Sequence, residues 1–224
     1  CSSDLEKGIK TAAIYGAFIP NPMHVYRVAG VLSGLGLSYD GATEEGEVVG
    51  KIFTDQSVDL SKISGDIQIV SYLQGYGDTT TDEINAAIQA KPEAFISVGM
   101  ATTFFTQQLN AAGIEFSDID SFTQSNGEAI TNGKLVYLAG KYSSSVGPAF
   151  ALVLNAINGN VIRDEQGNAV SLSQNYQVAT DEATFDEFYK SDNGDNPIYN
   201  KETLDQIIGE SVTFDEINEL VTSK

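Results

Sequence analysis

The chain has 224 residues, of which 42% are apolar, an ordinary share for a globular protein of one domain or two small lobes. Its charge is unusual, because 31 Asp and Glu against 12 Lys and Arg leave a net charge of −19. This excess of acids repels nucleic acid and anionic lipid, so we expect neither as a partner. The apolar runs fall well short of the ~20 residues that span a bilayer.

Short apolar runs alternate with helical patterns along the first 140 residues. We predict strands at 10–16, 67–73, 94–98, 114–119 and 135–139. Helical spacing predicts helices at 25–35, 84–88 and 105–112, the second opened by a capping box at 80–83 and the third ended by Gly113. Residues 48–53 fit a strand or an irregular excursion. The strands are continuous apolar runs, so we predict an α/β fold: a three-layer parallel sheet with helices on both faces.

Residues 147–157 predict a helix that is apolar on almost every side. Phe150, Val153, Leu154 and Ile157 form one stripe, while Leu152 and Ala156 point elsewhere. A helix that is apolar all round has to be covered on both sides. We therefore expect it to pack against a second copy of the chain or against the acidic C-terminal tail.

After Gly159 the pattern becomes irregular. We predict a strand at 173–180, a short acidic helix at 184–189, a turn-rich loop at 192–197, a helix around 204–208 and a last helix opened by the capping box at 213–216. This part is an irregular helical appendage rather than another strand–helix repeat. The predicted divisions are an α/β ligand-binding lobe, a hinge with the apolar helix, and an acidic tail, at 8–143, 144–170 and 171–224.

Groups for catalysis or metal binding are scarce. The chain has one histidine, His24, and one cysteine, Cys1, which excludes a disulfide framework and a His-based metal site. We expect His24 to face solvent or a ligand rather than act as a base. Residues 192–196 are rich in Asn, Gly and Asp, which turns require, and lack the spacing of a calcium loop. We predict no enzyme, no metal and no cofactor.

Polar and aromatic residues follow the predicted strands. In open parallel sheets, ligands bind beyond the carboxyl ends of the strands. Those ends carry Phe18, Asn21, Gln74, Met100, Asp120 and Lys141, with Arg27 nearby. This set suits a small polar ligand. Three members have alternative interpretations: Arg27 as a surface charge on a helix, Lys141 as a solvated loop charge and Asp120 as a helix cap.

Several segments resemble a known family. Residues 140–151 (GKYSSSVGPAFA) are similar to the hinge and following helix of type I periplasmic solute-binding proteins, the sugar-type receptors of ABC importers. Residues 163–168 and 173–180 resemble the tail of lipoprotein members, and 27–30 resembles the family's Arg-x-x-Gly. The likeness covers the second lobe and the tail, with most of the first lobe absent.

The resemblance implies roles for three charged residues. Arg27 matches an arginine that binds ligand oxygens with two N–H groups, a task suited to a guanidinium. Asp120 falls where the family often has a ligand-binding aspartate, and Lys141 stands where a glutamine is common. Gly99 and Met100 replace the usual Asn-Asp. These departures make an anionic or partly apolar ligand an alternative to a standard hexose.

The resemblance also implies a function. It indicates a non-enzymatic, extracytoplasmic solute-binding component of an ABC importer, or its ligand-binding lobe, with a small-molecule solute and the importer's membrane subunits as partners. Cys1 is then a candidate lipid-attachment residue of a cell-surface lipoprotein, or else a chance residue where a longer chain was cut. The alternative is a stand-alone α/β sensor or scaffold domain that forms a homodimer or docks a partner through helix 147–157.

Overall fold

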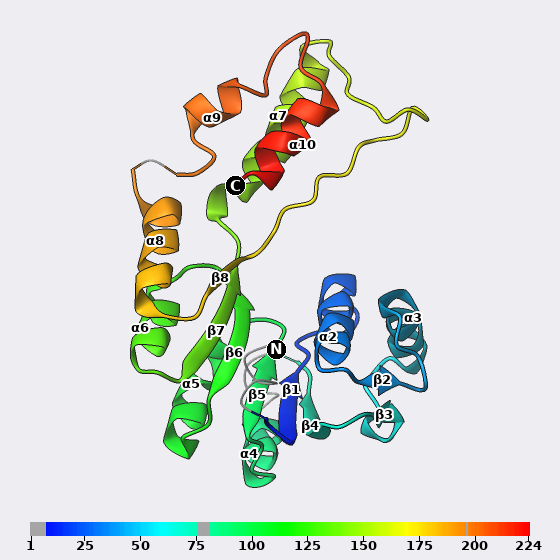
Figure 1. Ribbon diagram of the computed structural model, residues 1–224, viewed down its shortest axis with the longest axis vertical. Coiled ribbons are helices and arrows are strands. Elements are labelled where there is room, and N and C mark those ends of the chain that lie inside the picture. The colour runs from blue at the N-terminus through cyan, green and yellow to red at the C-terminus, as the bar shows by residue number, and fades with distance from the viewer. Residues whose placement is uncertain (1–7, 76–80, 196) are drawn as a thin grey trace. The chain divides into compact units, whose positions relative to one another are not determined.

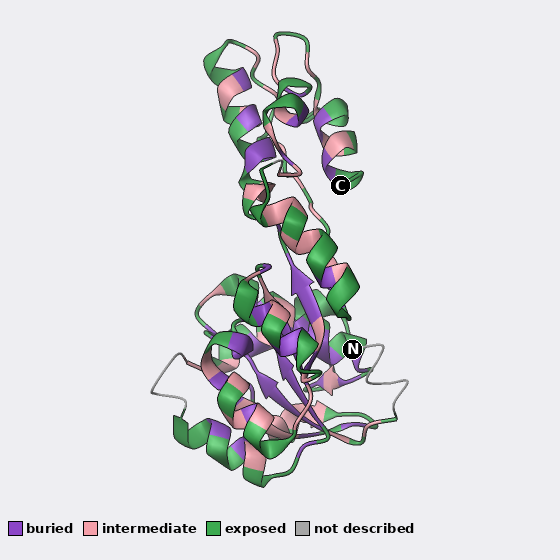
Figure 2. Ribbon diagram, turned by 90° about the vertical axis from the view of Figure 1, so that its left-hand side faces the viewer, coloured by how far each residue is buried: buried purple, intermediate pink, exposed green. Residues whose placement is uncertain are grey.

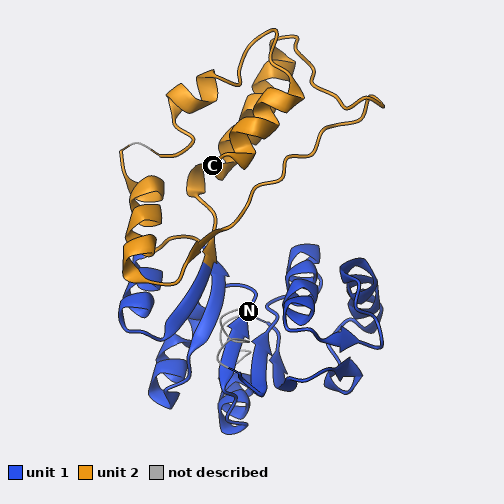
Figure 3. Cartoon of the chain, viewed as in Figure 1, with its two compact units in different colours: residues 1–120, 124–138 blue, residues 121–123, 139–224 orange. Residues whose placement is uncertain are grey.

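The computed structural model describes residues 8–75, 81–195 and 197–224. They fall into two compact units, shown in Figure 3: the first runs to Asp120 and includes 124–138, and the second comprises 121–123 and 139–224. Each unit has its own packing. The chain passes between them within strand β7 (Leu135–Gly140) and around 121–123.

The first unit is built from alternating strands and helices (Figure 1). Besides most of β7, its elements are β1 (Thr11–Tyr15), α2 (Pro22–Gly34), β2 (Ser38–Tyr39), α3 (Glu45–Asp55), η1 (Leu60–Lys62), β3 (Ile63–Ser64), β4 (Gln68–Leu73), α4 (Thr81–Gln89), β5 (Ala94–Ser97), α5 (Ala101–Ala112), β6 (Phe116–Asp120) and α6 (Gln124–Thr131). The order in the main sheet is β4-β1-β5-β6-β7-β8. The pairs β1–β4, β1–β5 and β5–β6 are parallel, which confirms the predicted fold class.

Along the chain, the strand after β1 is added on one side of it, as β4, and the later strands β5, β6 and β7 are added on its other side. The order of strands therefore reverses at β1. Connections between parallel strands are right-handed, so α2 and α3 lie on one face of the sheet and α4, α5 and α6 on the other. The central strands β1 and β5 are almost fully buried (Figure 2). Phe105 anchors the core, with its ring edge-on to Tyr15 at a centroid distance of 4.8 Å and to Phe95 at 6.0 Å.

The crossover from β1 to β4 carries more than one helix. It contains α2, α3 and a two-stranded antiparallel sheet in which Ser38 pairs with Ser64 and Tyr39 with Ile63. The prediction of a strand or irregular excursion at 48–53 was wrong, because this segment lies within α3. One face of that helix is buried and consists of Val48, Val49 and Ile52. The acids in its first turn stabilise the helix through their interaction with the positive end of the helix dipole.

The second unit is mainly helical. It contains the end of β7, η3 (Ser143–Val146), α7 (Gly147–Ile157), β8 (Gln177–Ala179), α8 (Glu182–Asn193), α9 (Lys201–Asp205) and α10 (Phe214–Thr222). The capping box predicted for the last helix is confirmed, since Thr213 and Glu216 bond each other's backbone N–H groups. Helix α8 is longer than predicted and takes in Asp192 and Asn193, which were assigned to a loop. Helix α6 was not predicted.

Helix α7 is covered on one face only. Ala151 packs with Ile207, Ile217 and Val221 of the tail. The tail thus folds back over the helix, which was one of the two kinds of packing expected. The opposite side carries Phe150, Val153 and Ile157, which are 56%, 57% and 75% exposed. This side is exposed within the described part of a single chain, and its packing against a second copy stays a prediction.

Candidate functional site

A pocket of about 510 Å³ lies beyond the carboxyl ends of β1 and β4, within the first unit. Two of the predicted site residues line it, Phe18 and Gln74. The other described lining residues are Ala17, Ile19, Pro20, Phe53, Gln56 and Gly75. The pocket therefore combines two aromatic rings and two carboxamides with apolar and backbone groups.

The loop after β1 is held against the loop after β4 by backbone contacts. The N–H of Gly16 donates to Leu73 O at 2.8 Å, and that of Gly75 donates to Ala17 O at 2.6 Å. Glycine is required at position 16, because an added Cβ would lie 1.9 Å from the hydroxyl of Tyr72. The Tyr15 hydroxyl donates to Gly75 O at 2.7 Å. These bonds fix the floor of the pocket.

His24 holds the position of Phe18. Its Nδ1 lies 3.0 Å from the backbone N of Phe18 and 3.1 Å from the backbone O, so either tautomer bonds to the loop. The imidazole is buried, and burial lowers the pKa of His24, with the nearby charge of Arg27 acting in the same direction. Of the two environments expected for His24, solvent is wrong, and contact with a ligand stays a prediction. It contacts the loop backbone that presents Phe18.

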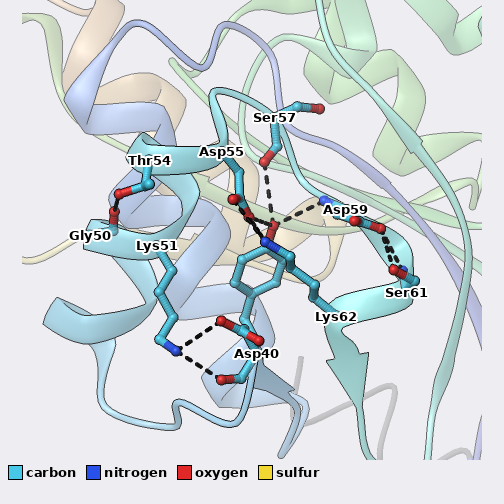
Figure 4. A network of polar contacts seen from close by, with 10 residues as sticks. Asp40, Gly50, Lys51, Thr54, Asp55, Ser57, Asp59, Ser61 and Lys62 are labelled. Atoms are coloured by element: carbon cyan, nitrogen blue, oxygen red, sulfur yellow. Dashed lines mark hydrogen bonds and ion pairs between the residues drawn. The ribbon is translucent and has the colours of Figure 1, made fainter.

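The second wall of the pocket comes from the end of α3, which supplies Phe53 and Gln56. A polar network fixes this end (Figure 4). The Tyr39 hydroxyl donates to Asp55 Oδ2 at 2.7 Å, and Lys62 Nζ lies 2.8 and 2.7 Å from the two carboxylate oxygens of Asp55. The bonds from Lys62 and Tyr39 lower the pKa of Asp55, and burial raises that of Tyr39 to about 12. Near neutral pH the Asp55 carboxylate is therefore ionised and the Tyr39 hydroxyl keeps its proton.

Arg27 lies at the reversal of the sheet order rather than in the pocket lining. Its Nη1 donates to Val98 O at 2.8 Å, and a Cβ on Gly99 would approach the same nitrogen to 3.3 Å. Met100 follows in a left-handed conformation, with φ of 70°, and is 39% exposed. One edge of the guanidinium is thus bound to the protein backbone. The two-pronged ligand contact expected of Arg27 stays a prediction.

The remaining predicted residues have separate environments. Asn21 is the N-cap of α2, and its side chain accepts from the N–H of Met23. Asp120 is half-buried at the end of β6. Lys141 belongs to the second unit, where its ammonium lies 5.1 Å from the centroid of the Tyr176 ring. Cys1, the candidate lipid-attachment residue, lies outside the described residues.

Sequence reasoning missed a buried carboxylate, Asp118. It accepts hydrogen bonds from Ser97 Oγ at 2.8 Å, from the N–H of Thr102 at 2.8 Å and from the N–H of Ile119 at 2.9 Å. Burial raises its pKa, and these bonds only partly oppose that effect. Asp118 joins β5 and β6 to the start of α5 and so orders the turn that carries Met100. An acid within an apolar strand was the signal that could have found it.

Among the described residues, no three or more His, Cys, Asp or Glu side chains gather closely enough to hold a metal ion. None of the helices in the described part of the chain combines the length and the hydropathy that crossing a bilayer requires.

Comparison with solved structures gives the fold relationship. One similar structure is an ABC transporter solute-binding protein from Bacillus halodurans C-125 with bound myo-inositol, with a TM-score of 0.50 and 14% identity over 84% of this chain and 57% of that one. This chain shares the fold of the part of that protein that it covers. Another similar structure is the periplasmic binding protein component of the arabinose ABC transporter from Shewanella sp. ANA-3, with a TM-score of 0.49, 15% identity, and coverage of 84% and 56%. No family model and no curated protein sequence matches the chain.

The chain spans a little over half the length of these two solved proteins. In a fold with an open parallel sheet, the carboxyl edge is the expected place for a ligand. Phe18 and Gln74 lie at that edge and were found from topology alone. Phe53 and Gln56, which complete the pocket, were not.

Proposed function

We propose that the protein is the extracytoplasmic solute-binding component of an ABC importer, or the ligand-binding lobe of one, and that it binds a small polar solute at the carboxyl edge of the first unit. The single observation that carries this proposal is the pocket between Phe18 and Phe53, at the ends of two parallel strands. The likeness in fold to an inositol-bound transport protein supports it. Binding, without a reaction, is the proposed activity.

The other predicted residues have proposed roles around this pocket. Arg27 and Asp120 would contribute polar contacts at the reversal of the sheet order, with Asn21 and Met100 beside them. The ligand contact implied for Lys141, which belongs to the second unit, stays a prediction. The partners proposed on the same basis are the importer's membrane subunits. Lipid attachment at Cys1, which would place the protein on the cell surface, is tested by mass spectrometry of the protein isolated from its natural source.

The proposal is tested by a binding titration on the full chain. Phe18 is 46% exposed and Phe53 38%, so the pocket buries only part of a ligand. We therefore expect simple sugars to bind with a dissociation constant of about 1 mM or weaker, measured by ligand-observed NMR. Phe18→Ala should weaken binding about fivefold, while Val161→Ala, at an exposed apolar residue outside the pocket, should not. Equal effects of the two variants would contradict the assignment.

A second candidate function rests on α7. Val146, Phe150, Val153 and Ile157 are exposed and follow one another at spacings of four, three and four residues, the pattern of a helix that packs along a partner helix. A stand-alone sensor or scaffold domain could form a homodimer through this stripe. Light scattering tests it: a dimer that Phe150→Asp converts to a monomer favours this function, and a wild-type monomer at high concentration rejects it.

A further inference from the structure

One wall of the pocket is a short loop, 17–20, which joins β1 to α2. The loop is held in an unfavourable conformation, because Ala17 has φ of 52°, in the left-handed region where a Cβ costs free energy. Ala17 is also fully buried, and its carbonyl accepts the N–H of Gly75 at 2.6 Å. A strained backbone persists only while the surrounding structure holds it. The shape of this wall therefore depends on the bonds on either side of Ala17.

The bond on the other side of Ala17 involves a titratable group. The N–H of Phe18 donates to Nδ1 of His24 at 3.0 Å. Nδ1 accepts this bond only while it carries no proton. Protonation turns Nδ1 into a donor that faces another donor, and the acceptor within its reach is Phe18 O at 3.1 Å, which already accepts from the N–H of Asn21 at 2.9 Å. A charged His24 therefore cannot keep the bond that it makes to the N–H of Phe18.

The surroundings of His24 favour its neutral form near neutral pH. Burial lowers the pKa of His24, the bond to Phe18 partly opposes that effect, and the positive charge of Arg27 adds to it. His24 is also the third residue of α2, at the positive end of the helix dipole, where a second positive charge is disfavoured. The neutral ring that the bond from Phe18 requires is thus the form present at pH 7.

The other described titratable groups around α2 are paired or lie away from the loop. Helix α3 packs against α2, and its charged side chains are Glu45, Glu47, Lys51 and Asp55. The glutamates lie in the first turn, at the far end of α3 from the pocket, and Asp55 stays ionised because bonds from Lys62 and Tyr39 lower its pKa. Asp118 also gains a proton on acidification, since burial raises its pKa, but its bonds are to β5, β6 and the start of α5. Of these groups, His24 is the one bonded to the loop.

We propose that His24 is a pH-sensitive latch of the pocket: its neutral imidazole holds loop 17–20 in the conformation that lines the pocket, and its protonation releases the loop. His24 is then a positioning residue, which acts on a solute through Phe18. Where it concerns a solute, the inference rests on the proposed function. A solute held at neutral pH should bind more weakly as the surroundings become acidic.

The latch is tested without a ligand, by NMR of the full chain between pH 7 and pH 4.5. His24 is the single histidine of the chain, so its imidazole resonances titrate without overlap. We expect the amide signals of Phe18 and Gly75 to shift with the His24 midpoint, and the exchange protection of the Phe18 N–H to fall about fivefold, the equivalent of one hydrogen bond. The N–H of Leu35, bonded to Val31 O at the other end of α2, is the internal control. A Phe18 amide that does not follow His24, or an imidazole that stays neutral down to pH 4.5, overturns the proposal.

Two substitutions separate the latch from a general effect of acid. His24→Asn supplies a carboxamide oxygen that accepts the N–H of Phe18 and does not titrate, so it should hold the loop at both ends of the pH range. His24→Phe keeps an aromatic ring without an acceptor, so it should release the loop at both. The wild type should resemble the first variant at pH 7 and the second at pH 4.5. If the Phe18 amide keeps its pH dependence in His24→Asn, another group is responsible and the proposal is wrong.

A separate measurement joins the latch to solute binding. Glucose, ribose and myo-inositol are titrated into the full chain at pH 7 and pH 4.5, by ligand-observed NMR. A sugar that binds at pH 7 should bind about fivefold more weakly at pH 4.5, and this loss should be absent in His24→Asn. An affinity that stays constant while the Phe18 amide shifts would contradict the action of His24 on a solute. If no sugar binds at either pH, the proposed function fails, and the ligand-free titration still decides whether His24 is a latch.

Discussion

The two compact units of the chain are stabilised by different means. The first has a large apolar core, in which Phe95 and Phe105 are buried between the sheet and α5. The second buries few large side chains around α7, and two asparagines on and after that helix bind the tail. Apolar burial is non-directional and tolerates small shifts, whereas buried amide bonds depend on geometry. We therefore expect core truncation to affect the first unit most and the loss of an amide to affect the second.

The largest expected effect is at Phe105. Phe105→Ala removes a ring that is 2% exposed and contacts Tyr15 and Phe95, so it should lower the free energy of unfolding of the first unit by about 4 kcal/mol. Urea denaturation followed by circular dichroism measures this change. The same substitution at Phe150, which is 56% exposed on α7, should cost less than about 0.5 kcal/mol at low protein concentration. Similar losses at both positions would mean that the α7 stripe is covered.

Asn155 should have the next largest effect. Its side chain is fully buried, with Nδ2 donating to Ile207 O and Oδ1 accepting from the N–H of Gly209, both at 2.9 Å. Asn155→Ala leaves both backbone groups without a partner and should destabilise the tail packing by about 3 kcal/mol. Hydrogen exchange in α9 and α10 should rise while exchange in β1 and β5 stays unchanged. Asn158→Ala, at an exposed C-cap, is the control.

The same contrast explains what the sequence could predict. The alternation of apolar runs and helical spacing identified the parallel α/β fold, because the apolar runs of β1 and β5 have few alternatives to burial on both faces. The segment 48–53 was misassigned because Val48, Val49 and Ile52 fit a short apolar strand as well as a buried helix face. Helix α6 was missed since its apolar face consists of Ala129 and Ile130 alone.

The candidate site was predictable only where topology fixes it. Phe18 and Gln74 follow strands, so the carboxyl-edge rule finds them. Phe53 and Gln56 lie on a helix of the crossover, and no local pattern shows that this helix ends at the same edge. Asp118 and Asp120 share one strand, and the position of Asp118 inside the apolar run, rather than at its end, was the one sign that it is the buried acid.

Asp118 provides a test of buried polarity within the first unit. Its pKa in the folded state is raised above the ordinary 3.8, so the folded protein holds the proton more tightly and loses stability as pH rises from about 4 through the raised value. Asp118→Asn cannot ionise. The variant should therefore gain stability relative to wild type as pH rises, measured by urea denaturation between pH 4 and pH 7.

Glu93 gives a control of opposite sign for that experiment. It accepts hydrogen bonds from the backbone N–H groups of Lys10 and Thr11, which lower its pKa below 4.5, so its contribution is present at higher pH and lost as pH falls through the lowered value. Glu93→Gln should lose stability relative to wild type as pH rises. Parallel pH dependences for the two variants would contradict the assignment of Asp118.

The smallest expected effect is at the last helix cap, and it tests whether the second unit responds locally. Thr213 Oγ1 accepts from the N–H of Glu216, and the Glu216 carboxylate accepts from the N–H of Thr213. Thr213→Ala removes one of these bonds and should destabilise α10 by about 1 kcal/mol. Because α10 supplies Ile217 and Val221 to the packing on α7, the loss should appear as faster exchange in α10 and easier proteolysis of the tail. If α2 and α5 exchange faster by the same factor, the two units unfold together, and their contrast in packing is not a contrast in stability.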